Sequence, residues 1–303
     1  MLPRTCAGCT VSCTEARMAD DVLDAARRNG GPTLGAVAIA RNELVDIKGF
    51  IEHLRGWIDE IVIVDDGSTD GTLDYLAACG FPVTVVHRRL EPEGGFAAQR
   101  NHGIEHARSD WLVHMDIDER ITPALAAEMR AAIRSTARNG FRYRRLNYFL
   151  HRPFHAGGWQ HWNAPQLGRR GAHRFVRPIH ERVEVDGGDP ATGQLAAMMV
   201  HLNDETFVER IRKNAGYSER TAREILAGGA RIRAWHLLVH PLKRALSAYL
   251  RHGAWRHGTH GLIFALYTFG GTFNWYACAW DEQNRIDRET LENALAQQWE
   301  HPE

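Results

Sequence analysis

Three carboxylates stand close together at the end of the short apolar run 111–115. Asp116 and Asp118 lie two residues apart, so in an extended segment their side chains leave the same face of the strand. Two like charges about 4 Å apart repel by roughly 4 kcal/mol at an effective dielectric near 20, so the pair favours a bound cation or a turn into water. A divalent metal with oxygen ligands, Mg²⁺ or Mn²⁺, would supply that charge. A solvated turn at the strand end is the alternative.

The segments around these acids alternate between strand-like and helix-like patterns. Short runs that are apolar on both faces indicate strands of a sheet covered on both sides. Helix-like stretches separate them, which predicts an α/β fold with a mostly parallel, Rossmann-like sheet and helices on both faces. The expected strands are 34–40, 61–64, 83–86 and 111–115, and the expected helices are 47–57, one that ends near 78, one that ends near 107, and 123–137.

The loops after these strands carry side chains that suit a nucleotide ligand. Parallel strands present their C-terminal ends at one edge, where open α/β sheets bind ligands. Asn42, Glu43 and Asp66 could accept hydrogen bonds from a base and a ribose. Arg100 and the helix N-terminus behind Gly94-Gly95 could face a pyrophosphate.

Some polar residues in these loops have a simpler interpretation. Ser68 and Asp70 precede a helix, where Ser and Asp are ordinary caps. Asp66 is harder to explain as a cap, because two successive aspartates at the end of a buried strand cost desolvation unless something binds them. Loop glycines, Gly67 among them, permit close approach of the backbone to a ligand.

Four of these segments, in this order, resemble the motifs of family 2 glycosyltransferases of the GT-A fold. The segments are Ala38–Glu43, Ile61–Thr72, Ala98–Ile104 and Met115–Glu119. The resemblance implies a nucleotide-sugar donor, a divalent cation held through the Asp-x-Asp motif, and inversion at the anomeric carbon. It places Asp118 on the metal, and it places the following residues on the nucleotide sugar, with Asp116 near the ribose or the metal: Ala40, Asn42, Glu43, Asp66, Gly67, Arg100, Asp116 and Ile117.

The middle of the chain offers candidates for catalysis and for acceptor binding. An inverting transfer needs a carboxylate or imidazole that takes the proton of the acceptor hydroxyl. Glu181 is the predicted base, and Trp159 and His180 are predicted acceptor contacts. A surface salt bridge from Glu181 to Arg177 or Arg182 is the alternative.

One histidine and three N-terminal cysteines are further side chains of types that bind metals. His201 follows the apolar run 198–200 and is a candidate to complete the coordination of the cation, although a lone His is more often structural. Cys6, Cys9 and Cys13 have no fourth ligand nearby at a familiar spacing, so residues 1–32 are predicted to be a flexible leader without a cofactor.

Composition limits the class of protein. The 303 residues include 37 basic and 37 acidic side chains, so the total charge gives no argument for a nucleic-acid partner. Five scattered cysteines do not describe a secreted disulfide framework. No apolar segment follows the first Met, so we expect no secretory signal peptide and a cytoplasmic location.

The C-terminal third has an uneven charge that the total hides. Between Glu224 and Asp281 there is no acid, while six cations and several histidines accompany apolar residues at helical spacing. A helix kinked or started near Pro241 and the uncharged run 262–280 are therefore predicted to lie on an anionic membrane surface. Packing on the catalytic domain or on a second copy in a homo-oligomer is the alternative. The tail also resembles the bacterial subgroup similar to lipopolysaccharide-core glucosyltransferases.

The sequence thus predicts a catalytic domain over 33–205, with 33–120 for the nucleotide sugar and 121–205 for the acceptor, and a helical region over 206–303. The predicted activity is inverting, metal-dependent transfer from a nucleotide diphosphate sugar, UDP-sugar favoured, to a cell-envelope glycan or glycolipid at the inner face of the cytoplasmic membrane. A non-catalytic binding protein of the same fold and a nucleotidyltransferase are the alternatives. The latter predicts a Gly-rich basic loop after the first strand, which Ala40-Arg41-Asn42-Glu43 fits poorly.

Overall fold

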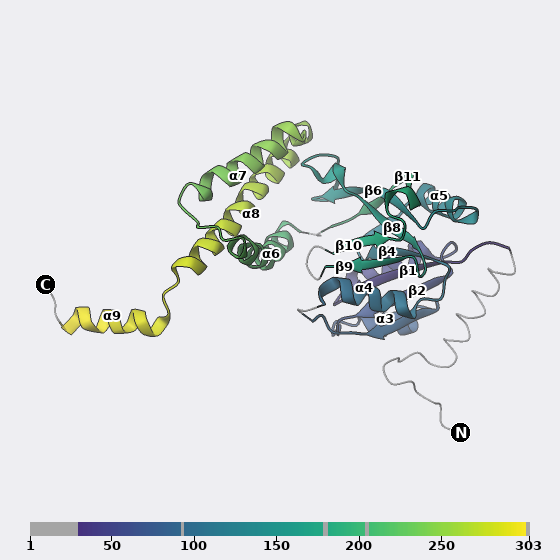
Figure 1. The fold of residues 1–303 in the computed structure, drawn as a ribbon, viewed down its shortest axis with the longest axis horizontal. Helices are drawn as coiled ribbons and strands as arrows, with labels where there is room; N and C mark the ends of the chain where they lie inside the picture. Colours follow the sequence, from purple (N-terminus) through teal and green to yellow (C-terminus); the bar gives the residue numbers. More distant parts are fainter. Residues whose placement is uncertain (1–29, 92–93, 178–180, 204–205, 301–303) are drawn as a thin grey trace, which may run out of the picture. The chain divides into compact units, whose positions relative to one another are not determined.

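The computed structural model describes residues 30–91, 94–177, 181–203 and 206–300. These residues form two compact units (Figure 1). Unit 1 comprises the described residues of Met1–Tyr148 and Gln160–Asn203, and unit 2 those of Phe149–Trp159 and Asp204–Glu303. The division near 205 expected from the sequence does not anticipate that Phe149–Trp159 belongs with the C-terminal helices.

One half of the unit 1 sheet is parallel. Its strands lie in the order β3-β2-β1-β4, and all pair in parallel. Every residue of β2 is buried, as a strand covered on both faces requires. The predicted α/β class and its four leading strands are therefore confirmed. The strands are β1 (Leu34–Ala40), β2 (Glu60–Asp65), β3 (Val83–His87) and β4 (Trp111–Asp116).

Alternate residues of these strands face opposite layers of helices. Ala36 and Ile61 join a core with α2, α3 and α5, while Val37 packs on the other face with Ile104 of α4. A Cβ on Gly103 would lie 2.5 Å from Val37 Cγ1, so glycine allows α4 to approach the sheet closely. The helices are α2 (Leu44–Leu54), α3 (Thr72–Ala78), α4 (Gly95–His106) and α5 (Pro123–Arg134).

The other half of the sheet is mixed. From β4 the order continues β8-β6-β11-β5, and β8 is antiparallel to both β4 and β6. β8 contains Pro165 and Gly168 and no regular apolar alternation, which is why the sequence does not predict it. A separate hairpin pairs β9 with β10. The strands are β5 (Glu119–Ile121), β6 (Gly140–Phe149), β8 (Asn163–Arg169), β9 (His173–Val176), β10 (Arg182–Val185) and β11 (Thr192–His201).

Unit 2 is built on one long helix. Both α6 and α7 pack against α8, and Phe264 of α8 joins an aromatic cluster with Phe149 and Phe154. Pro241 lies inside α7 rather than at its start. The elements are β7 (Arg152–Phe154), α6 (Phe207–Ala227), α7 (His236–Leu246), the π-helical turn Ser247–Arg251, the 3-10 turn Ala254–His257, α8 (Thr259–Asn284) and α9 (Arg288–Glu300). Within the described ranges, none of the helices combines the length and the apolar character that crossing a membrane requires.

Candidate active site

The carboxyl ends of β1, β2 and β4 meet at one edge of the sheet. In the parallel register Ala40 lies opposite Asp65, and Ile39 lies opposite Asp116. The loops after these strands therefore bring the polar residues predicted from the sequence to one rim, where α/β sheets bind ligands.

Asp116 forms an ion pair with the buried Arg100 of α4. Arg100 Nη2 donates to Asp116 Oδ1 at 2.5 Å, and the Arg100 side chain is 8% exposed. Burial raises the pKa of Asp116, but the charge and hydrogen bond of Arg100 outweigh burial and hold the pKa of this carboxyl below its usual value. Burial lowers the pKa of Arg100, and Asp116 more than offsets that effect. Both side chains are therefore charged at neutral pH.

Asp118 takes a different partner. β4 ends at Asp116, and Ile117 and Asp118 form a turn before β5 begins at Glu119. The expectation that Asp116 and Asp118 leave one face of an extended strand is therefore wrong. The turn reverses the chain so that β5 pairs antiparallel with β11, and it directs Asp118 to His201 at the end of β11.

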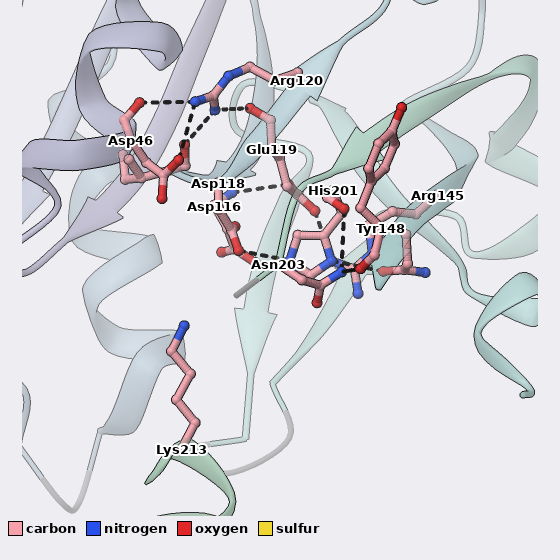
Figure 2. A network of polar contacts seen from close by, with 12 residues as sticks. Asp46, Asp116, Asp118, Glu119, Arg120, Arg145, Tyr148, His201, Asn203 and Lys213 are labelled. Carbon is pink, nitrogen blue, oxygen red and sulfur yellow. Dashed lines mark hydrogen bonds and ion pairs between the residues drawn. The ribbon is translucent and has the colours of Figure 1, made fainter. Parts of the chain in front are cut away.

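His201 lies between Asp118 and Asn147. Its Nε2 is 3.0 Å from Asp118 Oδ2 (Figure 2). Its Nδ1 is 2.8 Å from Asn147 Oδ1. When the Asn147 carbonyl oxygen accepts from Nδ1–H, the Nε2 atom of a neutral imidazole presents a lone pair to the Asp118 carboxylate. A lone pair that faces an anion needs a proton or a metal ion between them.

The turn that carries Asp118 is held from both sides. Glu119 Oε2 accepts from the Asp116 backbone N–H at 3.0 Å, and Glu119 Oε1 accepts from Arg145 Nη1 at 2.8 Å. Burial and the nearby Asp116 raise the pKa of Glu119. Arg120 donates to the carbonyl oxygen of the buried Ile117 and lies near Asp46 of α2 (Figure 2). Asp118 is thus carried on a fixed backbone.

Asp66 is satisfied within the protein. Its Oδ1 accepts from the Leu90 backbone N–H at 2.6 Å, and its Oδ2 accepts from Arg41 Nη1 at 3.1 Å. Asp65 accepts from the backbone N–H groups of Gly67 and Ser68. The paired aspartates at the end of β2 therefore do not require a ligand, contrary to the desolvation argument from the sequence, and a donor contact by Asp66 stays a prediction.

The loop after β1 is tied to the loop after β2. Asn42 has a φ of 57°, and its Oδ1 accepts from the Thr69 backbone N–H at 2.8 Å. The Glu43 backbone N–H donates to Thr72 Oγ1 at 2.9 Å. Asp70 Oδ1 accepts from the Thr72 backbone N–H at 3.0 Å, although the N-cap residue of α3 is Gly71, and not Asp70 as the sequence suggests.

Two smaller residues complete this rim. Ala40 is buried at the end of β1, and Gly67 has a φ of 84°, in the left-handed region that favours glycine. Both lie at the predicted nucleotide edge, and their contacts with a donor stay predictions.

Glu181 lines the same cavity as Arg100 and Asp116. The cavity has a volume of about 580 Å³ and lies within unit 1. Glu181 Oε1 is 3.5 Å from Arg100 Nε, and the Glu181 side chain is 25% exposed. Its ion-pair partner is therefore the buried Arg100, rather than Arg177 or Arg182 on the surface. This arrangement directs the predicted base into a cavity large enough for a sugar.

The structure does not test the other predicted acceptor contacts, Trp159 and His180. Trp159 belongs to unit 2, where its ring packs on Phe149 and Phe264 and lies under the Arg210 guanidinium. His180 lies outside the described residues, as do the three N-terminal cysteines. Acceptor contacts by Trp159 and His180 stay predictions.

Several side chains of the site were missed from the sequence. Arg145 and Asn147 come from β6. Gln166 of β8 and Trp162, which directly precedes β8, line the cavity. The sequence signal that could have found Arg145 and Asn147 is the alternation of inward-facing and outward-facing residues along β6. Tyr143 and Asn147 are buried at every second position with Arg145 between them, so charged and amide groups occupy inward-facing positions. No comparable pattern marks β8.

A metal would not be held by protein side chains alone. Among the residues that the structure describes, no three His, Cys, Asp or Glu side chains are grouped so that they could hold a metal ion. Asp118 and His201 form a pair, while Asp116 is engaged by Arg100.

The chain is similar to known glycosyltransferases. Residues 36–185 match the family described as "Glycosyl transferase family 2". The chain is 32% identical over 244 residues to the lipopolysaccharide core biosynthesis glycosyltransferase LpsC of Rhizobium meliloti (strain 1021), an alignment that covers 77% of this chain and 86% of LpsC. It is 23% identical over 237 residues to the uncharacterized glycosyltransferase RP128 of Rickettsia prowazekii (strain Madrid E), covering 74% of this chain and 79% of that protein.

Solved structures with detectable similarity share little sequence. TarS 1-349 of S. aureus in complex with UDP-GlcNAc is 14% identical with a TM-score of 0.44, covering 84% of this chain and 94% of that chain. The mannosyltransferase PcManGT from Pyrobaculum calidifontis in complex with GDP-Man and Mn²⁺ is 16% identical with a TM-score of 0.44, covering 91% and 96%. At these values the similarities say nothing about which donor or metal this chain binds.

Proposed function

Because this chain belongs to glycosyl transferase family 2, we propose that it transfers a sugar, with inversion, from a nucleotide diphosphate sugar to a hydroxyl of a cell-envelope glycan or glycolipid. The observation that supports this most is that Glu181 and the Arg100–Asp116 pair line one cavity at the carboxyl end of β4. The family favours a glycosyltransferase over both a nucleotidyltransferase and a non-catalytic binding protein.

Glu181 is the proposed general base. In the transfer, the acceptor oxygen attacks the anomeric carbon, the bond from that carbon to the diphosphate breaks, and the carboxylate takes the proton of the attacking hydroxyl. The 3.5 Å ion pair with Arg100 Nε fixes the position of the carboxylate in the cavity. Arg100 is in turn held by Asp116, so the base rests on a buried and rigid support.

The donor is proposed to lie at the rim formed by the ends of β1, β2 and β4. Asn42, Glu43, Asp66 and Arg100 supply carboxylate, amide and guanidinium groups there. The space beside Gly67 is filled by the Arg89 guanidinium, a further positive charge at this rim. A UDP-sugar is favoured, as in the expectation from the sequence. Binding of the nucleotide does not depend on Glu181, which gives the two roles separate tests.

The Asp118–His201 pair fits a divalent metal ion. The Nδ1 hydrogen bond to Asn147 would leave Nε2 free to coordinate, and an outer hydrogen bond of this kind orients many metal-binding histidines. Mg²⁺ is commonly held by one or two protein ligands together with substrate phosphates, so a two-residue site is sufficient when the nucleotide is bound. When bound, the metal would neutralise charge on the departing diphosphate.

The acceptor is proposed to be a component of a lipopolysaccharide core. LpsC, which aligns with most of this chain, is named for that pathway. An acceptor of this kind is anchored in a membrane, so the enzyme must work at a lipid surface.

Unit 2 carries a surface suited to an anionic membrane. We call it the α7 surface and define it by exposed apolar residues and cations on α7 and the turns that follow. Leu238 is 64% exposed and Leu250 is 60% exposed. Each cation contributes about 1 kcal/mol near an anionic leaflet, which supports reversible attachment at the inner face of the cytoplasmic membrane. The surface comprises Leu238, Leu242, Lys243, Leu246, Leu250, Arg251 and Trp255.

The proposal is tested with a panel of UDP- and GDP-sugars with Mn²⁺ and a lipopolysaccharide-core acceptor. We expect release of one nucleotide in a metal-dependent manner, with stabilisation of the protein by UDP in thermal-shift measurements. Absence of both donor turnover and metal-dependent nucleotide binding would favour the non-catalytic alternative.

A matched pair of variants tests the base. Glu181→Gln should lower the transfer rate by about 10²–10⁴-fold, the range for loss of a general base, while UDP stabilisation survives. Glu184→Gln is the control, because Glu184 lies on β10 and pairs with the exposed Arg174. Full transfer by the Glu181 variant would show that another group is the base.

A further inference from the structure

The cavity beside Glu181 contains polar groups that the proposed reaction does not use. Its lining includes four arginines, and Arg100 alone is engaged by the two carboxylates of the lining, Asp116 and Glu181. The others are Arg142 and Arg145 of β6 and Arg182 of β10. Arg145 and Arg142 each pair with one acid outside the lining, Glu119 and Asp189. A guanidinium has five N–H donors, so one such pair leaves further donors for a ligand.

Two buried atoms without hydrogen-bond partners belong to residues of the same lining. Within the described part of the chain, Arg145 Nε and Gln166 Oε1 are buried and have no hydrogen-bond partner, and both residues line this cavity. A buried polar atom left unpaired costs about 1–3 kcal/mol, so it is usually satisfied by a ligand or by water. Arg145 Nε needs an acceptor, and Gln166 Oε1 needs a donor.

A sugar with an acidic substituent supplies both groups. A carboxylate or phosphate accepts from Arg145 and from the neighbouring guanidinium groups, and a hydroxyl donates to Gln166 Oε1. Arginine suits such anions because its planar fork matches their oxygens. A neutral sugar would satisfy Gln166 but would leave the guanidinium donors without an anionic partner.

The position of the cavity assigns it to the acceptor. Asp118 and His201, the proposed metal ligands, are not part of its lining, whereas the proposed base Glu181 is. Most of its walls come from β6, β8 and β10 and the segments beside them, and no residue of the β1 and β2 loops lines it. Arg100 and Asp116 also line it, so the cavity adjoins the rim proposed for the donor.

We propose that this cavity selects an acceptor sugar that carries an anionic group, with Arg142, Arg145 and Arg182 facing the anion and Gln166 a hydroxyl. The inference rests on the proposed function, since it names the acceptor class for the same site. A carboxylate and a phosphate share the required chemistry.

The test measures binding of three small probes to the whole protein with UDP and Mn²⁺ present. Methyl glucuronide carries a carboxylate, glucose 6-phosphate carries a phosphate, and methyl glucoside is neutral. We expect at least one acidic probe to bind about tenfold or more tightly than the neutral probe, a difference of about 1.4 kcal/mol. The tighter of the two acidic probes identifies the anion. Equal Kd values for all three probes in the wild-type protein would overturn the inference.

Variants locate the effect. Arg142→Gln with Arg182→Gln should reduce the preference for the acidic probe to what Arg145 alone supports, and leave the Kd of methyl glucoside unchanged. Gln166→Leu should weaken all three probes by a similar factor, because it removes only the hydroxyl contact. Arg174→Gln is the control, since Arg174 lies on β9 and pairs with Glu184 on the surface.

An undiminished acidic preference in the double variant would also contradict the inference. Stabilisation of each variant by UDP shows that it is folded and competent for the donor, so loss of acidic selectivity remains distinguishable from failure of the proposed transfer activity.

Discussion

In unit 1 several charged side chains of the site are buried and paired, whereas on the α7 surface of unit 2 large apolar side chains are exposed beside cations. Arg100 and Glu119 are both less than 10% exposed, and each binds an opposite charge. On the α7 surface, Trp255 is 51% exposed. Buried ion pairs are costly unless they have a function or excellent geometry, and exposed apolar residues beside cations suit a lipid surface.

The difference separates two kinds of recognition. The rim of unit 1 is preorganised to a large extent, because contacts within the protein already hold Asp66, Arg100 and Asp116 before any ligand arrives. The α7 surface depends on summed burial and charge, to which each residue contributes little. Removing one side chain should therefore have a large effect in unit 1 and a small one in unit 2.

The largest effect is expected from Arg100→Met. It leaves Asp116 and Glu181 without their shared cation. Because both carboxylates are partly exposed, water offsets part of the loss, and the cost is about 1.5–3 kcal/mol, the range for a hydrogen bond to a charged group. Urea unfolding should show that loss of stability, and hydrogen exchange should place it in β4 and α4. Arg174→Met, which removes a surface ion pair, should change stability by less than about 1 kcal/mol. If the two variants are equally stable, the Arg100 pair is not the support described above.

A smaller effect is expected from Lys243→Gln together with Arg251→Gln on the α7 surface. Both side chains are exposed, and two lost cations at about 1 kcal/mol each correspond to roughly 30-fold weaker binding to anionic vesicles. Binding to vesicles containing phosphatidylglycerol should weaken with salt in the wild-type protein. The exposed pair Arg220→Gln with Arg223→Gln on α6 is the control.

The same measurement separates a membrane from a second protein copy. The wild-type protein could bind neutral and anionic vesicles equally, and could self-associate in a way that Lys243→Gln with Arg251→Gln abolishes. Both results together would assign the α7 surface to a homo-oligomer instead.

The smallest effect concerns pH and the buried pair His114–His173. The two Nε2 atoms lie 2.7 Å apart, and His173 Nδ1–H donates to the Arg169 carbonyl. Burial, with His173 and Arg100 nearby, lowers the pKa of His114 well below 6.5, and burial lowers the pKa of His173. Since the unfolded chain then binds more protons than the folded chain, stability should fall as the pH drops below about 6.5.

His173→Gln should make this pH dependence shallower by at most about 1.4 kcal/mol per pH unit, the value for one proton. Urea unfolding between pH 5 and pH 8 measures the slope. His53, whose pKa burial and Arg120 lower to about 4, should leave a remaining slope in the variant. An unchanged slope would mean that His173 is not held neutral by the fold. The stability of unit 2 should depend less on pH than that of unit 1, because the histidines of unit 2 lie nearer the surface.

Much of the fold follows from local pattern. The runs that become β1, β2, β3 and β4 are apolar on both faces, and the prediction of helix between them needs only the sequence nearby. β8 could not be predicted in this way, because its stability as a strand comes from pairing with β4 on one side and β6 on the other. Strand pairing between distant segments leaves no periodic signal in either segment.

The candidate site divides in the same manner. The sequence by itself predicted Arg100, Asp116 and Glu181 as site residues, since their residue types and their order along the chain are local properties. Only the tertiary structure decided the partners: Asp116 with Arg100, Asp118 with His201, and Arg145 with Glu119. The physical reason is that a turn at Ile117–Asp118 reverses the chain after β4, and the energy of a buried charge depends on what the fold places beside it.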